Sequence, residues 1–110
     1  AYNVHKELGP GLLESAYKTC LCYELSKIEI NYEKQKGLPI IYKDVTLDCG
    51  YRIDILVENK IVIELKTVEK LLPIHTAQIM TYLKLSNKHL GLLFNFYNAN
   101  LQNGIKRYVL

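Results

Sequence analysis

Three charged residues, Asp54, Glu64 and Lys66, lie on two predicted strands that are close together in the chain. Apolar residues alternate with other residues over 51–67, which is the period-two pattern of a β-hairpin with one buried face. The odd apolar positions are Tyr51, Ile53, Ile55, Val57, Ile61, Ile63 and Leu65. Glu64 and Lys66 are two residues apart, so we expect them on one strand face, about 7 Å from each other.

The length of the turn decides whether Asp54 joins this pair. A two-residue loop at positions 58 and 59 would place Asp54 on the face opposite to Glu64. A three-residue loop over 58–60 would pair Val57 with Ile61 and Asp54 with Glu64. Only the longer loop places all the odd apolar residues on one side, so burial selects it. The sequence therefore predicts Asp54 and Glu64 as cross-strand neighbours.

Two neighbouring carboxylates repel each other unless a cation lies between them. Lys66 could be that cation, and Mg²⁺ is another, because it is commonly held by one or two carboxylates with waters and phosphates. A metal there could lower the pKa of a bound water, while Lys66 could stabilise developing charge. The alternative is a salt-bridged face in solvent, which is the commoner outcome for a charged hairpin taken alone.

The remaining patterns predict the elements that must position this hairpin. They are a helical turn or two over 1–8, a helix over 12–28, extended chain over 30–35, a strand over 38–47 in which Lys43 and Asp44 could form a turn, a helix over 73–86, a strand over 90–97, a polar loop over 98–104 and a strand over 105–110. The strand over 90–97 is almost wholly apolar, as in a strand buried on both faces. A helix between two strands suggests a crossover, so we expect a mixed sheet with helices packed against it.

Composition limits the class of protein. The 110 residues form one predicted domain, 1–110, with 49% apolar and 23% charged residues. The net charge of +3 permits an anionic partner without requiring one. The three cysteines have no metal-binding spacing, which favours reduced thiols and a cytoplasmic location. Neither a run of 18 apolar residues nor a signal peptide is present, so we expect no membrane segment.

At this point the residues resemble a known family. Gly11, Glu14 and Tyr17 match in full the motif for which the GxxExxY proteins are named. Further matching segments occur in order at 51–54, 63–66, 75–78, 82–84, 90–96 and 105–107. The GxxExxY family resembles a branch of the PD-(D/E)xK nuclease superfamily. This resemblance implies an α/β restriction-endonuclease-like core, a mixed β-sheet flanked by helices in the order helix, three strands, helix, strand (αβββαβ).

The resemblance also implies a metal site. Asp54, Glu64 and the Leu65 carbonyl would bind Mg²⁺ or Mn²⁺, and Glu14 matches the first-helix acid that often completes the site. Asp54, Glu64 and Lys66 would be catalytic. The residue before Asp54 is isoleucine rather than proline, at a position that varies in the superfamily.

The implied activity is metal-dependent hydrolysis of nucleic-acid phosphodiester bonds, in DNA more than in RNA. Gln78 and Tyr82 match a Gln-x-x-x-Tyr helix motif of related nucleases, and Gln78 would orient water or substrate. The residues expected to bind substrate are Tyr17, Arg52, Tyr82 and Arg107, with Lys34, Lys36 and Lys70 as further phosphate contacts. The alternatives are a catalytically dormant nucleic-acid-binding module and an oligomerisation module, and a homodimer is plausible.

Overall fold

The computed structural model describes all residues 1–110. Its helices are α1 (Tyr2–Leu8), α2 (Glu14–Lys27) and α3 (Pro73–Ser86), with a 3₁₀ turn η1 (Leu101–Gly104). Its strands are β1 (Tyr32–Gly37), β2 (Ile40–Tyr42), β3 (Val45–Leu47), β4 (Arg52–Val57), β5 (Ile61–Lys66), β6 (Leu90–Asn95) and β7 (Ile105–Val109). No helix is both long and apolar enough to cross a membrane.

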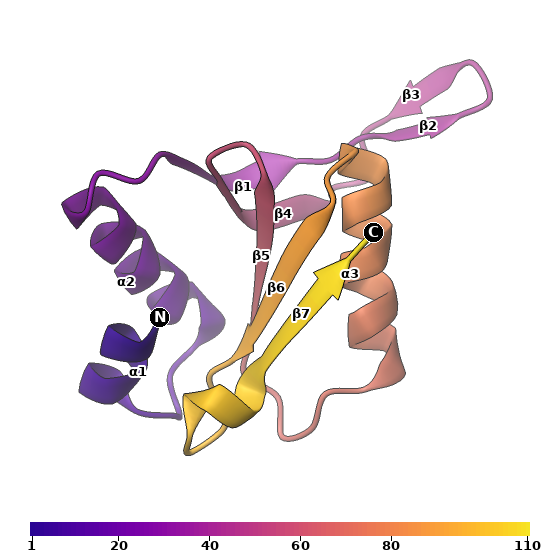
Figure 1. Cartoon of the computed structure of the whole chain (residues 1–110). Helices are drawn as coiled ribbons and strands as arrows, with labels where there is room; N and C mark the ends of the chain where they lie inside the picture. The colour runs from indigo at the N-terminus through magenta and orange to yellow at the C-terminus, as the bar shows by residue number, and fades with distance from the viewer.

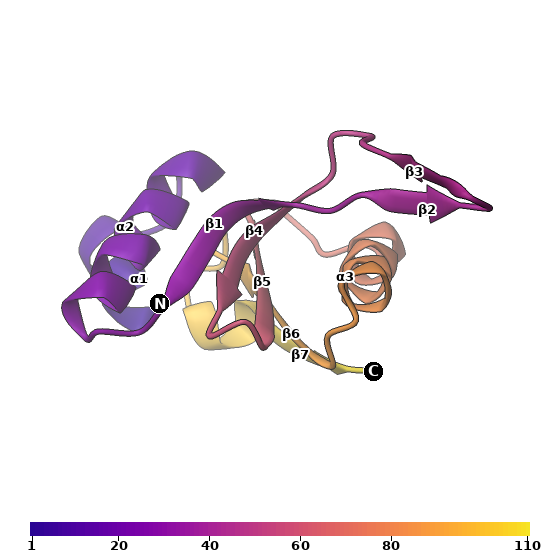
Figure 2. The ribbon, with the colours of Figure 1, turned by 90° about the horizontal axis from the view of Figure 1, so that it is seen from above.

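The molecule has three layers, with helices on both faces of one central sheet. The five-stranded sheet has the order β1-β4-β5-β6-β7. Helices α1 and α2 cover one face and α3 covers the other (Figure 1, Figure 2). Each face has its own buried cluster, one with α1 and α2 and one with α3. The predicted α/β fold with a mixed sheet flanked by helices is confirmed.

The crossover between β5 and β6 makes the sheet mixed. Strand β6 pairs with β5 in parallel and with β7 antiparallel, and α3 makes the connection. Within β6, Leu93 belongs to the α3 cluster, whereas Phe94 belongs to the α2 cluster. The strand is therefore buried on both faces, as its apolar sequence predicts. It ends at Asn95, two residues earlier than expected.

The central hairpin has the predicted three-residue loop, because Val57 pairs with Ile61. The prediction that all odd apolar residues share one face is wrong, since Ile53 packs with Leu56 in the α3 cluster. Strand β1 pairs with β4 on both sides of Gln35, but Gln35 itself has φ +55° in the left-handed region. The alternation of side chains along β4 thus changes opposite this irregular residue.

The strand predicted over 38–47 is a separate hairpin of two short strands, β2 and β3, and the turn between them lies at Lys43 and Asp44, as the sequence allowed. It projects from the three-layered body on the side of α3 (Figure 2). Its exposed large apolar side chains are Ile41, Tyr42, Val45 and Leu47. The polar loop expected over 98–104 also differs, because it contains the 3₁₀ turn η1 with buried Leu101.

Candidate active site

The site forms where β4 and β5 stop pairing through their backbones. Their regular pairing extends from the turn to Ile55 and Ile63. Beyond that point, the Asp54 backbone N–H donates a hydrogen bond to Glu64 Oε1 at 3.2 Å. The Leu65 N–H in turn donates to Asp54 Oδ2 at 2.9 Å. Each carboxylate is thus held by the opposite strand, and the structure brings Asp54 and Glu64 side by side.

Burial controls the charge of Glu64, which is only 3% exposed. The loss of solvation, mainly, and the nearby charge of Asp54 raise the pKa of Glu64 to about 8. Metal-free Glu64 therefore keeps a proton at neutral pH. Protonation of Glu64 avoids the repulsion that two ionised acids side by side would suffer.

A chain of hydrogen bonds fixes the lysine of the site. Lys66 Nζ donates to Gln78 Oε1 at 2.9 Å, and Gln78 Nε2 donates to the Tyr82 hydroxyl at 3.2 Å. Burial raises the pKa of the Tyr82 phenol, whose oxygen accepts this bond. Gln78 and Tyr82 lie four residues apart on α3 and share a face toward β5. Gln78 therefore links the Lys66 side chain to α3.

Lys18 is a site residue that the sequence analysis missed. It lies on α2, and its Nζ is 3.3 Å from Asp54 Oδ1. Both side chains are largely shielded, with exposures of 14% for Lys18 and 18% for Asp54. The signal was present, because Lys18 is four residues after Glu14 and so shares its helix face. Any helix orientation that directs Glu14 toward the hairpin directs Lys18 there as well.

Glu14 itself is not joined to the two acids. It is the first residue of α2, partly buried, and it makes none of the site's hydrogen bonds or ion pairs. No group of three or more His, Cys, Asp or Glu residues lies close enough to hold a metal ion. The structure therefore brings together two of the three predicted acidic ligands, and Lys18 is the α2 residue that reaches Asp54.

The remaining donor set still fits a hard divalent cation. Asp54 and Glu64 offer carboxylate oxygens, and the Leu65 peptide directly follows Glu64 in the sequence. Mg²⁺ is usually bound by one or two carboxylates and completes its shell with water and substrate phosphates. A carboxyl group with a pKa raised by burial and by a neighbouring acid is also the group that a cation would most favour in its ionised form. Two acids are thus sufficient for such a site.

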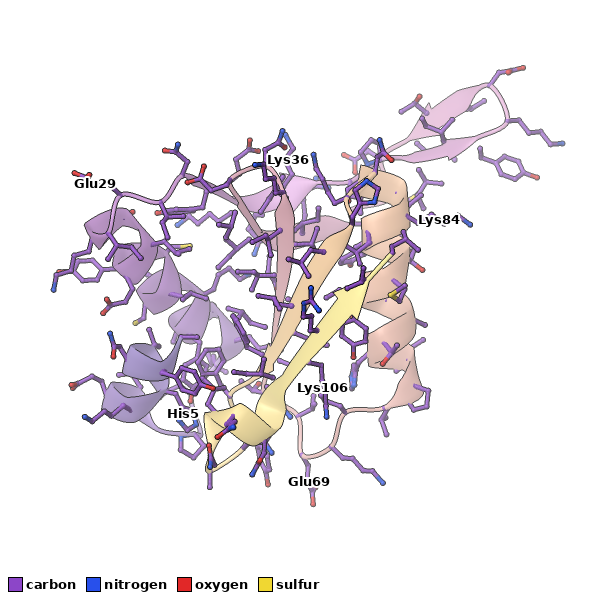
Figure 3. The ribbon with its side chains drawn as sticks, in the orientation of Figure 1. His5, Glu29, Lys36, Glu69, Lys84 and Lys106 are labelled. Atoms are coloured by element: carbon purple, nitrogen blue, oxygen red, sulfur yellow. The ribbon has the colours of Figure 1, made fainter.

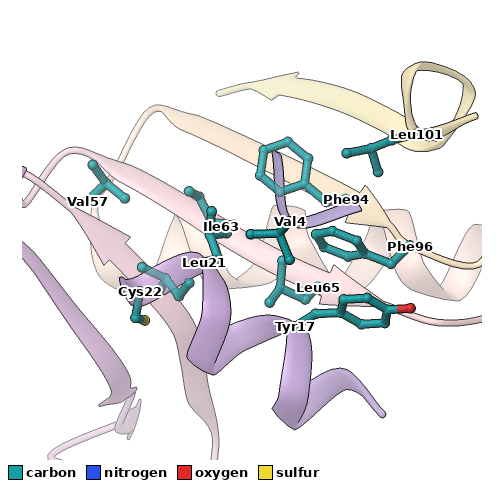
Figure 4. Close-up of a cluster of buried hydrophobic side chains, with 11 residues drawn as sticks. Val4, Tyr17, Leu21, Cys22, Val57, Ile63, Leu65, Phe94, Phe96 and Leu101 are labelled. Carbon is teal, nitrogen blue, oxygen red and sulfur yellow. The ribbon is translucent and has the colours of Figure 1, made fainter. Parts of the chain in front are cut away.

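The structure corrects the predicted role of Tyr17 in substrate binding. Tyr17 is fully buried and stacks on Phe96 at 4.3 Å between ring centroids, as Figure 4 shows. Its hydroxyl donates to the Gly9 carbonyl and accepts from the Leu12 N–H at 3.1 Å. Gly11 has φ +109°, which favours glycine. The Gly and Tyr of the motif therefore shape the loop that leads into α2.

The other predicted substrate contacts lie on several elements. Arg52 is exposed on β4 and donates to Asp48 at 3.2 Å and to the Tyr51 carbonyl at 2.8 Å. Arg107 is exposed on β7, and Lys36 on β1 pairs with Glu33 at 3.0 Å.

Further lysines are just as scattered. Lys34 is exposed on β1, and Lys70 is exposed in the loop after β5. Figure 3 shows Lys36, Lys84 and Lys106 on β1, α3 and β7 respectively. The basic residues named here therefore lie on several different elements.

The comparisons with known proteins agree with this geometry. The chain has no match among the curated proteins or the solved structures with which it was compared. A family model described as the PD-(D/E)XK nuclease superfamily matches residues 1–108, which is nearly the whole chain. With an acid on β4, an acid and a lysine on β5, and this match, the chain belongs to the PD-(D/E)XK nuclease superfamily.

Proposed function

We propose that this protein is a metal-dependent nuclease that hydrolyses phosphodiester bonds, with DNA as a better substrate than RNA. The observation that carries the proposal is the pair of hydrogen bonds by which β4 and β5 hold Asp54 and Glu64 together, beside Lys66. A solvated, salt-bridged face would not bury a carboxyl group to 3% exposure next to a second acid. The preference for DNA rests on the resemblance to PD-(D/E)xK nucleases.

The acids and the lysine have different roles in this proposal. Asp54, Glu64 and the Leu65 carbonyl would hold Mg²⁺ or Mn²⁺, which would supply a more acidic water and neutralise phosphate charge. Lys66 would donate to the attacking water or to a phosphate oxygen, in a position fixed by Gln78. Arg52 and Arg107 are proposed as outer phosphate contacts, which orient the substrate without reading its sequence.

The test begins with metal binding. We expect Mn²⁺ or Mg²⁺ titrated into the protein, with and without a DNA oligonucleotide, to give binding heat in the parent and none in Asp54→Ala. Asp44→Ala is the matched control, because Asp44 lies between β2 and β3 and has no ion pair. In cleavage assays on single-stranded, duplex and branched DNA and on RNA, we likewise expect activity in the parent and in Asp44→Ala and none in Asp54→Ala. Absence of binding in the parent, even with DNA, would refute a metal-dependent nuclease.

A dormant binding module is the second candidate, and the missing third acid favours it. In that case the parent would cleave nothing, and Asp54→Asn would bind DNA as tightly as the parent or more tightly, because a negative charge is removed. Measuring both binding and cleavage on the same oligonucleotides therefore separates the two candidates.

A homodimer also remains a proposal. The β2–β3 hairpin exposes four large apolar side chains although an isolated two-stranded hairpin is only marginally stable. Contact with a second copy would cover them, and sedimentation over a range of concentrations would detect it. Ile41→Lys should shift a dimer toward the monomer, and a parent that is monomeric at all concentrations would exclude the dimer. The three free thiols fit the reducing cytoplasm that we propose as its location.

A further inference from the structure

An open apolar groove lies beside the proposed site, between α3 and the base of the β2–β3 hairpin. Its volume is about 230 Å³. The apolar and aromatic residues that line it include Ile40, Tyr51, Ile74, Tyr82 and Leu85. In Figures 1 and 2 the hairpin leaves the body next to α3, which forms one wall of the groove. None of the lining residues is charged, so the groove is not built for phosphate.

The groove is joined to the proposed site by a single side chain. Gln78 lines the groove, and its Oε1 accepts the hydrogen bond from Lys66 Nζ at 2.9 Å. Its Nε2 contacts Tyr82, whose ring lies 6.3 Å from that of Tyr51 in an edge-to-face arrangement. A nucleotide whose phosphate lies at Lys66 would therefore have its base within reach of the two tyrosines.

Size and chemistry both suit one planar ring system. Pockets for drug-sized ligands occupy roughly 300–1,000 Å³, so this groove is smaller. Tyr51 is 44% exposed, which leaves part of its ring free for stacking. Aromatic rings bind bases of any sequence in this way, because every base has a π-face. Gln78 and Thr81 are the polar residues of the groove and could meet the polar edge of a base.

We propose that this groove binds an unpaired nucleobase next to the scissile phosphate, and that the substrate class is single-stranded or branched nucleic acid. The inference rests on the proposed function for its phosphate site. Bases in an intact duplex are stacked on one another, so only a base that has left the stack can enter. The proximity of Lys66 favours a nucleotide over a second protein chain as the occupant.

The test is fluorescence anisotropy with a single-stranded oligonucleotide and a blunt duplex, both with Ca²⁺ in place of Mg²⁺ to limit cleavage. We expect the parent to bind the single strand more tightly. Tyr51→Ala should weaken single-strand binding by roughly tenfold, from the typical contribution of one stacked base, and leave duplex binding unchanged. Tyr51→Phe should retain it. Tyr23→Ala is the matched control, since Tyr23 is 64% exposed on α2 across the sheet.

A second variant protects the test against a folding defect. Thr81→Trp, at an exposed position of α3, should fill the groove and weaken single-strand binding to a similar extent. Equal affinity of parent and both variants, or equal losses for single strand and duplex, would overturn the inference. So would a parent dimer that Tyr51→Ala dissociates, because a second copy would then occupy the groove. If Tyr51→Ala selectively loses single-strand binding but the parent cleaves nothing, the base-binding groove would stand and the nuclease function would be rejected. If the parent cleaves with metal but Tyr51→Ala binds the single strand as tightly as the parent, the nuclease function would stand and the groove would be rejected.

Discussion

The buried carboxyl group of Glu64 should make the metal-free protein less stable as the pH rises. Unfolding exposes Glu64 and returns its pKa from about 8 to its ordinary 4.5. Between these values the folded state holds a proton that the unfolded state has lost, so the free energy of unfolding falls by about 1.4 kcal/mol per pH unit. The stability is fully present below the unfolded pKa and is lost through the folded pKa. The accumulated loss is about 1 kcal/mol at pH 5 and about 4 kcal/mol at pH 8.

Glu64→Gln tests this linkage because the glutamine side chain cannot ionise but keeps an oxygen that can accept the hydrogen bond from the Asp54 N–H. We expect urea unfolding in EDTA and reductant to show a variant that is more stable than the parent by about 4 kcal/mol at pH 8, and by about 1 kcal/mol at pH 5. Glu69→Gln, an exposed acid without a partner after β5, is the control and should follow the parent. Parallel pH curves for the parent and Glu64→Gln would show that Glu64 ionises normally and refute the reasoning.

Two further predictions follow from α2. Lys18→Met removes a cation 3.3 Å from Asp54, so calorimetry should show Mn²⁺ binding roughly tenfold more tightly than to the parent. Lys27→Met is the control, because it removes the same charge from the far end of α2 and should change the affinity less than twofold. Equal affinities for the two variants would exclude a direct effect of Lys18. Tyr17→Phe removes the hydroxyl that bonds the Leu12 N–H and the Gly9 carbonyl, so the free energy of unfolding should fall by about 1–3 kcal/mol in thermal unfolding. An unchanged unfolding midpoint would contradict a structural role for this hydroxyl.

The sequence predicts the central hairpin well because burial fixes its register. Only a three-residue loop hides the odd apolar side chains, and the pairing of Val57 with Ile61 confirms that loop. Burial does not fix which face of the sheet the residues before Asp54 occupy. Gln35, with φ +55°, lies opposite Asp54 in β1, and Ile53 turns to the α3 face. Gln is not a residue whose type indicates a left-handed conformation, so no local signal was available.

The axial position of α2 is equally hidden from the sequence. Helical periodicity identifies the stripe that contains Glu14 and Lys18, but not which of the two lies level with Asp54. That depends on how far α2 extends along the sheet, which the Tyr17 contacts with Phe96 and Gly9 set through tertiary packing. The pair of carboxyl groups on the hairpin could be predicted because Asp54 and Glu64 lie close in sequence. The residue of α2 that meets Asp54 could not be predicted, because α2 is distant from the hairpin in the sequence.

The Lys18 ion pair and the proton on Glu64 together explain how two acids coexist in this protein without a metal. The ammonium of Lys18 balances Asp54, and the raised pKa leaves Glu64 neutral at pH 7. The Lys18 ammonium and the Glu64 proton therefore lie close to the oxygens proposed as metal ligands, in addition to the Lys66 ammonium. A divalent cation that released this proton and moved the Lys18 ammonium away from Asp54 would bring the same positive charge to these oxygens. On the proposed function, one arrangement of strands would therefore hold the two acids in place both before and after metal binding, without a third carboxylate.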